Sequence, residues 1–238
     1  FCNIYSSFFQ RGYDQVIHDI ALQKLPVVIC LDRAGIVGED GPTHHGAFDL
    51  AFLRAVPNLI IASPINEIEL RQMLYTAYCQ REKPFVIRYP RGRGVLQNWK
   101  VPFEELPIGK AQILKKGEKM AILSLGPLGN FVAEALETLR EENIMPAHIN
   151  IRFLKPLDYD MLKEISSQYN TLITVEDGTE LGGLYSAVSE YLSENHLQNK
   201  LYKIALPDKF IEHGSADSLY VQLGMDRKGI ADLIRKHY

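Results

Sequence analysis

The sequence PVVICLDRAGIVGEDGPTHHGAFDLAFLRA, residues 26–55, decides how the first half of the chain folds. It opens with six apolar residues, 26–31, and such a short run rich in β-branched side chains is typical of a strand buried on both faces. A loop with four glycines follows over residues 32–47. Loops of this length inside a compact domain usually serve a function or are disordered. Residues 48–55 then predict a short helix.

The sequence on either side continues this alternation of strands and helices. We predict strands at residues 1–5, 59–62 and 85–89, and helices at residues 7–23 and 63–80. Strands that alternate with helices in this way are typical of a parallel α/β sheet.

A second α/β unit is predicted beyond residues 95–108, which carry two prolines, show no periodicity and read as a linker. Its predicted elements are strands at 119–125, 147–153, 172–176 and 202–205, and helices at 130–143, 159–168, 183–194 and 226–237. The fold class is therefore α/β with two domains, residues 1–100 and residues 105–238.

Composition and charge exclude several classes of protein. The 26 Lys and Arg residues against 29 Asp and Glu residues give a net charge of −3, so there is no broad basic surface for nucleic acid or for an anionic membrane. Three widely spaced cysteines argue against a disulfide framework and a cysteine-rich zinc site. With no apolar stretch near the ~18 residues of a membrane span and no signal peptide, we expect a cytoplasmic protein. The chain starts without Met, in strand-like sequence, so we expect it to be a piece of a longer protein.

Polar residues follow three of the predicted strands in the first domain. Because parallel sheets bind ligands outside the carboxyl ends of their strands, these side chains should meet at one edge. They are Tyr5, Asp32, Arg33, Asp40, His44, Arg91 and Arg93.

These residue types suggest anion binding and proton transfer. Arg33 and Arg91 could hold a phosphate or carboxylate, with surface ion pairing as the alternative. His44 can move protons near neutral pH and Asp40 can orient it or bind a hydroxyl, whereas turn formation and a solvent-facing histidine are the alternatives. The adjacent His44 and His45 should point apart, and no third ligand has a suitable spacing, so we predict no metal site.

An aromatic platform is predicted near the N-terminus. Phe8 and Arg11 are three residues apart and can share a helix face, where they could stack a flat heterocycle. A core phenylalanine beside a surface arginine is the alternative.

Three runs carry a family resemblance: IYSSFFQRGYDQVIHD at residues 4–19, LDRAGIVGEDGPTHHGAFDLAFLR at 31–54 and IRYPRG at 87–92. Together they resemble the 1-deoxy-D-xylulose-5-phosphate synthase family, thiamine-diphosphate-dependent relatives of transketolase. The resemblance covers the whole chain, less distinctively over residues 105–238. It implies a pyrimidine-binding domain that lacks its N-terminal part, followed by a smaller α/β domain of the transketolase C-terminal type.

The resemblance also implies roles for the predicted site. Phe8 would stack on the aminopyrimidine of thiamine diphosphate, with Arg11 close to the same ring. The resemblance implies that Tyr5, Asp40 and His44 line the substrate cavity and are the catalytic candidates. It implies that Arg33 and Arg91 bind the phosphate of D-glyceraldehyde 3-phosphate.

The implied activity is the condensation of pyruvate with D-glyceraldehyde 3-phosphate to 1-deoxy-D-xylulose 5-phosphate with loss of carbon dioxide. This transferase reaction opens the non-mevalonate route to isoprenoids and also serves thiamine biosynthesis, and related enzymes are homodimers. The family's GDG motif with its downstream Asn, which holds the diphosphate and Mg²⁺, does not occur in the chain. We therefore expect these residues alone neither to bind thiamine diphosphate tightly nor to turn over.

Two alternatives are open at this point. The β subunits of the 2-oxoacid dehydrogenases share the two-domain plan, but they accept no phosphorylated aldehyde, so a paired Arg33 and Arg91 argues against them. The other alternative is a non-catalytic core that only dimerises.

Overall fold

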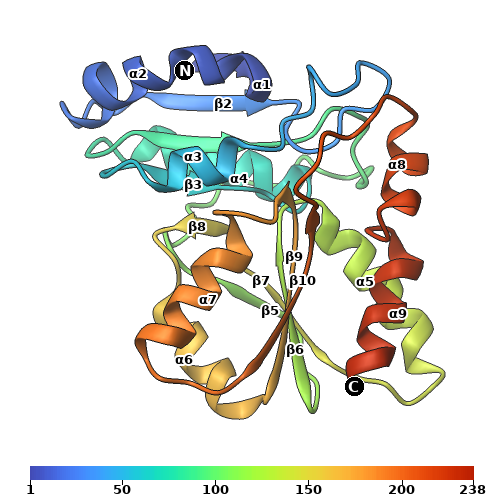
Figure 1. Cartoon of the computed structure of the whole chain (residues 1–238). Helices are drawn as coiled ribbons and strands as arrows, with labels where there is room; N and C mark the ends of the chain where they lie inside the picture. Colours follow the sequence, from blue (N-terminus) through green and yellow to red (C-terminus); the bar gives the residue numbers. More distant parts are fainter.

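The computed structural model describes residues 1–238 and contains two five-stranded sheets flanked by helices (Figure 1). This arrangement confirms the predicted two-sheet α/β class. The first half holds β1 (Cys2–Tyr5), α1 (Ser6–Phe9), α2 (Tyr13–Gln15), β2 (Val28–Asp32), α3 (Asp49–Arg54), β3 (Ile60–Ala62), α4 (Glu67–Cys79) and β4 (Phe85–Arg88). The second half holds β5 (Gln112–Lys115), β6 (Met120–Leu125), α5 (Leu128–Arg140), β7 (Ala147–Asn150), β8 (Phe153–Lys155), α6 (Tyr159–Gln168), β9 (Thr171–Thr179), α7 (Leu184–Glu194), β10 (Lys200–Leu206), α8 (Ala216–Gln222) and α9 (Arg227–His237).

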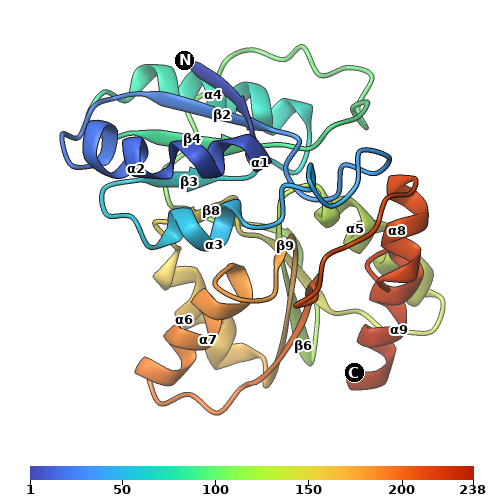
Figure 2. The same ribbon diagram turned by 45° about the horizontal axis from the view of Figure 1, so that its top comes forward.

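The first sheet has the strand order β1-β2-β4-β3-β8, and its first four strands are parallel. Side chains alternate between its two faces, as the period of a strand requires. Cys30 packs with α4, whereas Ile29 and Leu31 pack with the segment of α1 and α2 and with α3. Figure 2 shows these helices on opposite faces of the sheet. Both faces are therefore covered, which explains the continuous apolar runs in the sequence.

The second sheet has the order β10-β9-β6-β7-β5, parallel except for the edge strand β5. Helices α6 and α7 lie on one side of it, and α5 and α9 lie on the other (Figure 1). One buried cluster contains Ile29 and Leu50 of the first half together with Leu123 and Leu172 of the second. The two halves thus share a continuous apolar core.

The prediction of a single strand over residues 147–153 is wrong. The chain turns at Arg152, whose φ of 59° is left-handed, and separates β7 in the second sheet from β8 in the first. Strand β8 runs antiparallel to β3, where Phe153 pairs with Ala62 and packs edge-on against Phe85 at 6.2 Å between ring centres. A strand from the second half therefore completes the first sheet.

Other elements differ in detail from the sequence prediction. Strand β5 and helix α8 were not predicted, and β9 is longer than residues 172–176. The helix predicted over residues 7–23 is a run of short pieces: α1, a 3₁₀ turn at Gln10–Gly12, α2 and a π-helical stretch at Val16–Ala21. The 95–108 segment contains no helix or strand, in agreement with its interpretation as a linker. No helix combines the length and the apolar character needed to cross a membrane.

Candidate active site

Tyr5 and Phe8 form a pair of stacked rings at the carboxyl end of β1. Tyr5 is the last residue of the strand and the N-cap of α1, so Phe8 lies one turn away from it. The ring centres are 5.2 Å apart at an interplanar angle of 22°, and Phe8 is 47% exposed. An exposed, rigid aromatic face of this kind suits stacking against a flat heterocycle.

Arg33 folds back over this platform. It follows β2 with a left-handed φ of 57°, a conformation that costs a non-glycine residue about 1–3 kcal/mol and must be held by its surroundings. Its guanidinium carbon lies 4.0 Å from the centre of the Tyr5 ring, a cation–π contact. Its Nη1 donates to Oδ2 of Asp40 at 3.1 Å.

Arg91 reaches the same oxygen from the next strand end. It lies three residues beyond the end of β4, and its Nη1 donates to Oδ2 of Asp40 at 2.8 Å. Strands β2 and β4 are parallel neighbours, so their carboxyl ends bring the two arginines to one place. The structure thus joins Arg33, Arg91 and Asp40, as the strand-end argument expected.

His44 borders the platform from the glycine-rich loop. Its ring meets Phe8 edge-on with 5.4 Å between ring centres, and its Nδ1 lies 2.9 Å from Oγ1 of Thr43. The imidazole is half-buried between the loop and the aromatic pair. Tyr5, Phe8, Arg33, Asp40, His44 and Arg91 therefore form one contiguous group, which we call the strand-end cluster.

Arg11 and Arg93 are not part of the strand-end cluster. Arg11 lies exposed in the 3₁₀ turn after α1, and its side chain makes no hydrogen bond or ion pair. Arg93 lines a separate cavity of about 270 Å³ between the start of α4 and the start of α5. The structure thus separates Arg93 from its neighbour Arg91.

His45 holds the loop to the second half of the chain. Its Nδ1 accepts a hydrogen bond from the backbone N–H of Val37 at 3.0 Å, so the neutral ring carries its proton on Nε2, 3.4 Å from the carbonyl oxygen of Glu212. Burial lowers the pKa of His45, which favours this neutral form. His44 contacts Phe8, whereas His45 contacts Val37 and Glu212, so the two adjacent imidazoles have different neighbours.

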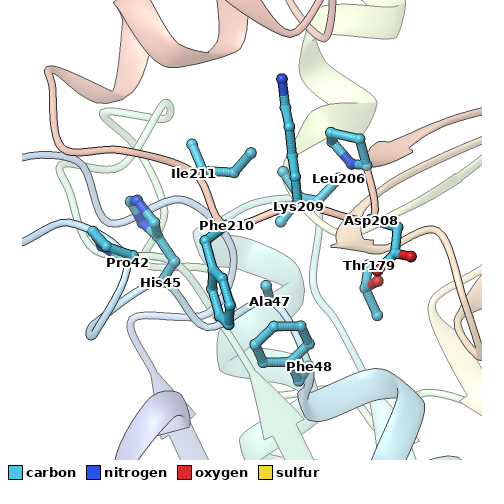
Figure 3. Close-up of a pocket in the computed structure, with 11 residues that line it drawn as sticks. Pro42, His45, Ala47, Phe48, Thr179, Leu206, Asp208, Lys209, Phe210 and Ile211 are labelled. Carbon is cyan, nitrogen blue, oxygen red and sulfur yellow. The ribbon is translucent and has the colours of Figure 1, made fainter.

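A cavity of about 230 Å³ lies on the His45 side, between the loop and residues 206–211 (Figure 3). Phe48 and Phe210 meet edge-on there with 6.5 Å between ring centres, and Lys209 also lines the cavity, with its amine directed away from the two rings. This cavity is not the place where the cations converge, because Arg33 and Arg91 do not line it.

Sequence reasoning missed a buried ionic group directly beneath the loop. Arg88 is 1% exposed and donates to Asp49 at 2.9 Å and to Asp177 at 2.6 Å. The one signal in the sequence was the charge of Arg88 within the otherwise apolar strand predicted over residues 85–89. A guanidinium buried in such a strand requires carboxylate partners. No local sequence pattern selects Asp49 and Asp177 as those partners.

Domain comparisons identify the family. The pyrimidine-binding domain of transketolase matches residues 1–95, and the transketolase C-terminal domain matches residues 109–230. The chain belongs to the transketolase family.

Similar proteins within that family are 1-deoxy-D-xylulose-5-phosphate synthases. Those of Parabacteroides distasonis and Bacteroides thetaiotaomicron are 54% and 52% identical to this chain over 99% of its residues. That of Dictyoglomus turgidum is 48% identical over 97%. The chain spans 37% of the length of each relative.

A solved structure resembles the whole chain. It is described as a split gene transketolase, inactive beta4 tetramer, and superposes with a TM-score of 0.85 at 27% identity. The match covers 99% of this chain and 74% of the other.

Proposed function

We propose that this chain supplies the acceptor-binding and pyrimidine-binding side of a 1-deoxy-D-xylulose-5-phosphate synthase active site. The complete enzyme would condense pyruvate with D-glyceraldehyde 3-phosphate, release carbon dioxide and form 1-deoxy-D-xylulose 5-phosphate, a precursor of isoprenoids and thiamine. The names of the relatives and the transketolase-type domains support this assignment.

The observation that carries the proposal is the convergence of Arg33 and Arg91 on Oδ2 of Asp40. Two guanidiniums that share one carboxylate oxygen define a point where an anion is held. A phosphate group offers each guanidinium several acceptor oxygens and a larger charge than a carboxylate does. We assign the phosphate of the aldehyde substrate to these two side chains.

The residues present fit the pyrimidine of thiamine diphosphate but not its diphosphate. The exposed Phe8 ring offers a stacking face, with Arg11 in the next turn. The GDG motif that the family resemblance assigns to the diphosphate and Mg²⁺ does not occur in residues 1–238, so we assign both groups to a part of the complete enzyme outside this chain. When bound, thiamine diphosphate accepts the electron pair released by decarboxylation of pyruvate.

The remaining residues of the strand-end cluster act on the acceptor. The imidazole of His44 can donate a proton to the carbonyl oxygen of the aldehyde as the new carbon–carbon bond forms. Asp40 can accept a hydrogen bond from a substrate hydroxyl. The Tyr5 ring orients Arg33 through its cation–π contact with the guanidinium. Together they would bind the aldehyde with its phosphate held away from the reacting carbon.

We also propose that the active assembly is a cytoplasmic homodimer without nucleic-acid or membrane partners. The split transketolase that resembles this chain is described as inactive in its beta4 form, which supports the need for a complementary part. Purified residues 1–238 should therefore give no 1-deoxy-D-xylulose 5-phosphate from the two substrates, thiamine diphosphate and Mg²⁺. Product formed by this chain alone would refute that expectation.

The test of the assignment compares Arg91→Ala with Arg93→Ala in the active holoenzyme. Loss of a phosphate-binding arginine should cost on the order of 2–4 kcal/mol in kcat/KM for D-glyceraldehyde 3-phosphate. Unphosphorylated D-glyceraldehyde should be affected far less, and Arg93→Ala should change neither. A negligible change in kcat/KM for D-glyceraldehyde 3-phosphate with Arg91→Ala would favour the 2-oxoacid dehydrogenase alternative. A dimer without affinity for thiamine diphosphate, measured by light scattering and calorimetric titration, would fit the dimerising core.

A further inference from the structure

Arg88 ties three distant parts of the chain together. It is the last residue of β4, and its Nε donates to Oδ2 of Asp49 in α3 at 2.9 Å. Its Nη1 donates to Oδ1 of Asp177 in β9 at 2.6 Å, and its Nη2 donates to the carbonyl oxygen of Gly46 at 3.3 Å. Asp177 belongs to the second half of the chain, so this contact connects the two sheets.

The contact with Gly46 falls at the neck of the glycine-rich loop. We define the neck as Gly35 and Gly46, which exchange two backbone hydrogen bonds of 2.9 Å and 2.8 Å. Arg88 binds the Gly46 side of the neck. Asp177 packs on the other side, because a Cβ atom on Gly35 would lie only 2.1 Å from its Oδ2. One ion pair therefore touches both ends of the loop.

The neck fixes the strand-end cluster. Arg33 lies two residues before Gly35, and Asp40 and His44 lie within the loop that the neck closes. Backbone N–H of Ala34 donates to the carbonyl oxygen of Tyr89 at 3.0 Å, which connects the same place to the segment that carries Arg91. A displacement of the neck would move cations and imidazole relative to the aromatic platform.

The ionic group is poorly explained as a stabilising device. Its two carboxylates share one guanidinium, and Arg88, Asp49 and Asp177 are each at most 1% exposed. Oδ2 of Asp177 is buried without a hydrogen-bond partner. Buried ion pairs often add no more stability than apolar packing, and an unpartnered charged oxygen adds a cost. Precise placement of the neck accounts for these features better.

We propose that Asp177 is a positioning residue for the substrate site: through Arg88 it fixes the neck, and with it the distance between the phosphate-binding arginines and the aromatic platform. This inference rests on the proposed function. It assigns to the second half of the chain a part in acceptor binding, although Asp177 itself touches no substrate.

The experiment measures steady-state kinetics of Asp177→Asn and Arg88→Lys in the active holoenzyme. Asn has the shape of Asp, and Lys keeps the charge but lacks the planar, rigid fork of guanidinium N–H groups that reaches Asp49, Asp177 and Gly46 together. Each variant should raise KM for D-glyceraldehyde 3-phosphate about 10-fold, because small displacements of binding groups are costly. KM for pyruvate should change less than about 2-fold, since the donor does not depend on the two arginines.

Glu69→Gln is the matched control. Glu69 in α4 also pairs with a residue of the second half, Arg152 at 2.6 Å, but none of its partners belongs to the glycine-rich loop. This variant should lower the melting temperature without raising KM for the aldehyde. A positioning role is supported if Asp177→Asn and Arg88→Lys raise KM for the aldehyde while their melting temperatures are no lower than that of Glu69→Gln.

Three failing outcomes are distinguishable. In the first, Arg91→Ala raises KM for the phosphorylated aldehyde, but Asp177→Asn and Arg88→Lys have the same KM for it as Glu69→Gln. The positioning role is then wrong and the proposed function stands. If Arg91→Ala also leaves that KM unchanged, the proposed function fails together with the inference. If neither variant of the buried pair folds while Glu69→Gln does, the pair is structural and the inference is overturned.

Discussion

The guanidinium carbon of Arg33 lies 4.0 Å from the centre of the Tyr5 ring, and this contact connects the aromatic platform to the two arginines that we assign to the substrate phosphate. Removal of the ring face in Tyr5→Leu should cost roughly 0.5–2 kcal/mol, a 2- to 30-fold rise in KM for D-glyceraldehyde 3-phosphate. Tyr5→Phe keeps the ring face and should leave that KM within about 2-fold of wild type. An equal rise in both variants would assign the effect to the hydroxyl instead.

Phe8 should contribute to cofactor affinity through its exposed ring. Stacking of an aromatic side chain on a heterocyclic base is worth about 1–3 kcal/mol, so Phe8→Ala should raise the apparent KM for thiamine diphosphate roughly 5- to 160-fold in the holoenzyme. Phe48→Ala is the control, since Phe48 is similarly exposed at 40% but lies outside the strand-end cluster. No difference between the two variants would remove Phe8 from the cofactor site.

Glu176 should make stability depend on pH. Burial raises its pKa to about 7. The hydrogen bonds that its carboxylate accepts from the backbone N–H groups of Leu184 and Tyr185 lower the pKa, but by less. Between the unfolded value of 4.5 and about 7 the native state holds a proton that the unfolded chain releases, so this contribution to stability is lost as pH rises. Glu176→Gln cannot release that proton. Its unfolding free energy should gain on the order of 3 kcal/mol relative to wild type between pH 4.5 and 8.

Urea denaturation at a series of pH values measures this difference. His148, whose pKa burial lowers to about 4, has the opposite effect, since its contribution is lost as pH falls below its unfolded value of 6.5. Because His148 is present in both proteins, it cancels in the comparison. Parallel stability curves for wild type and Glu176→Gln would show that Glu176 is ionised throughout.

The strand ends could be predicted from the sequence because local patterns determine them. The apolar run at residues 26–31 and the strand at 85–89 placed Arg33 and Arg91 at neighbouring carboxyl ends without any knowledge of side-chain positions. The observed contacts of both arginines with Asp40 follow from that topology. Their roles toward substrate stay a prediction until the kinetic tests are made.

The contribution of the second half could not be predicted in the same way. Strand β8 follows β7 after a turn at Arg152, and only tertiary packing sends it to the other sheet. Likewise, 89 residues separate Arg88 from Asp177, and no periodicity connects them. Partner choice in a buried ion cluster depends on which chain segments meet, which a local pattern does not contain.

A double-mutant cycle on Arg33 and Arg91 tests the central claim most directly. Two arginines that bind one phosphate act as a unit, so the effects of Arg33→Ala and Arg91→Ala on kcat/KM for D-glyceraldehyde 3-phosphate should be coupled by about 0.5–3 kcal/mol. For unphosphorylated D-glyceraldehyde the coupling should vanish. Strictly additive effects with the phosphorylated substrate, or the same coupling with both aldehydes, would contradict a shared phosphate site.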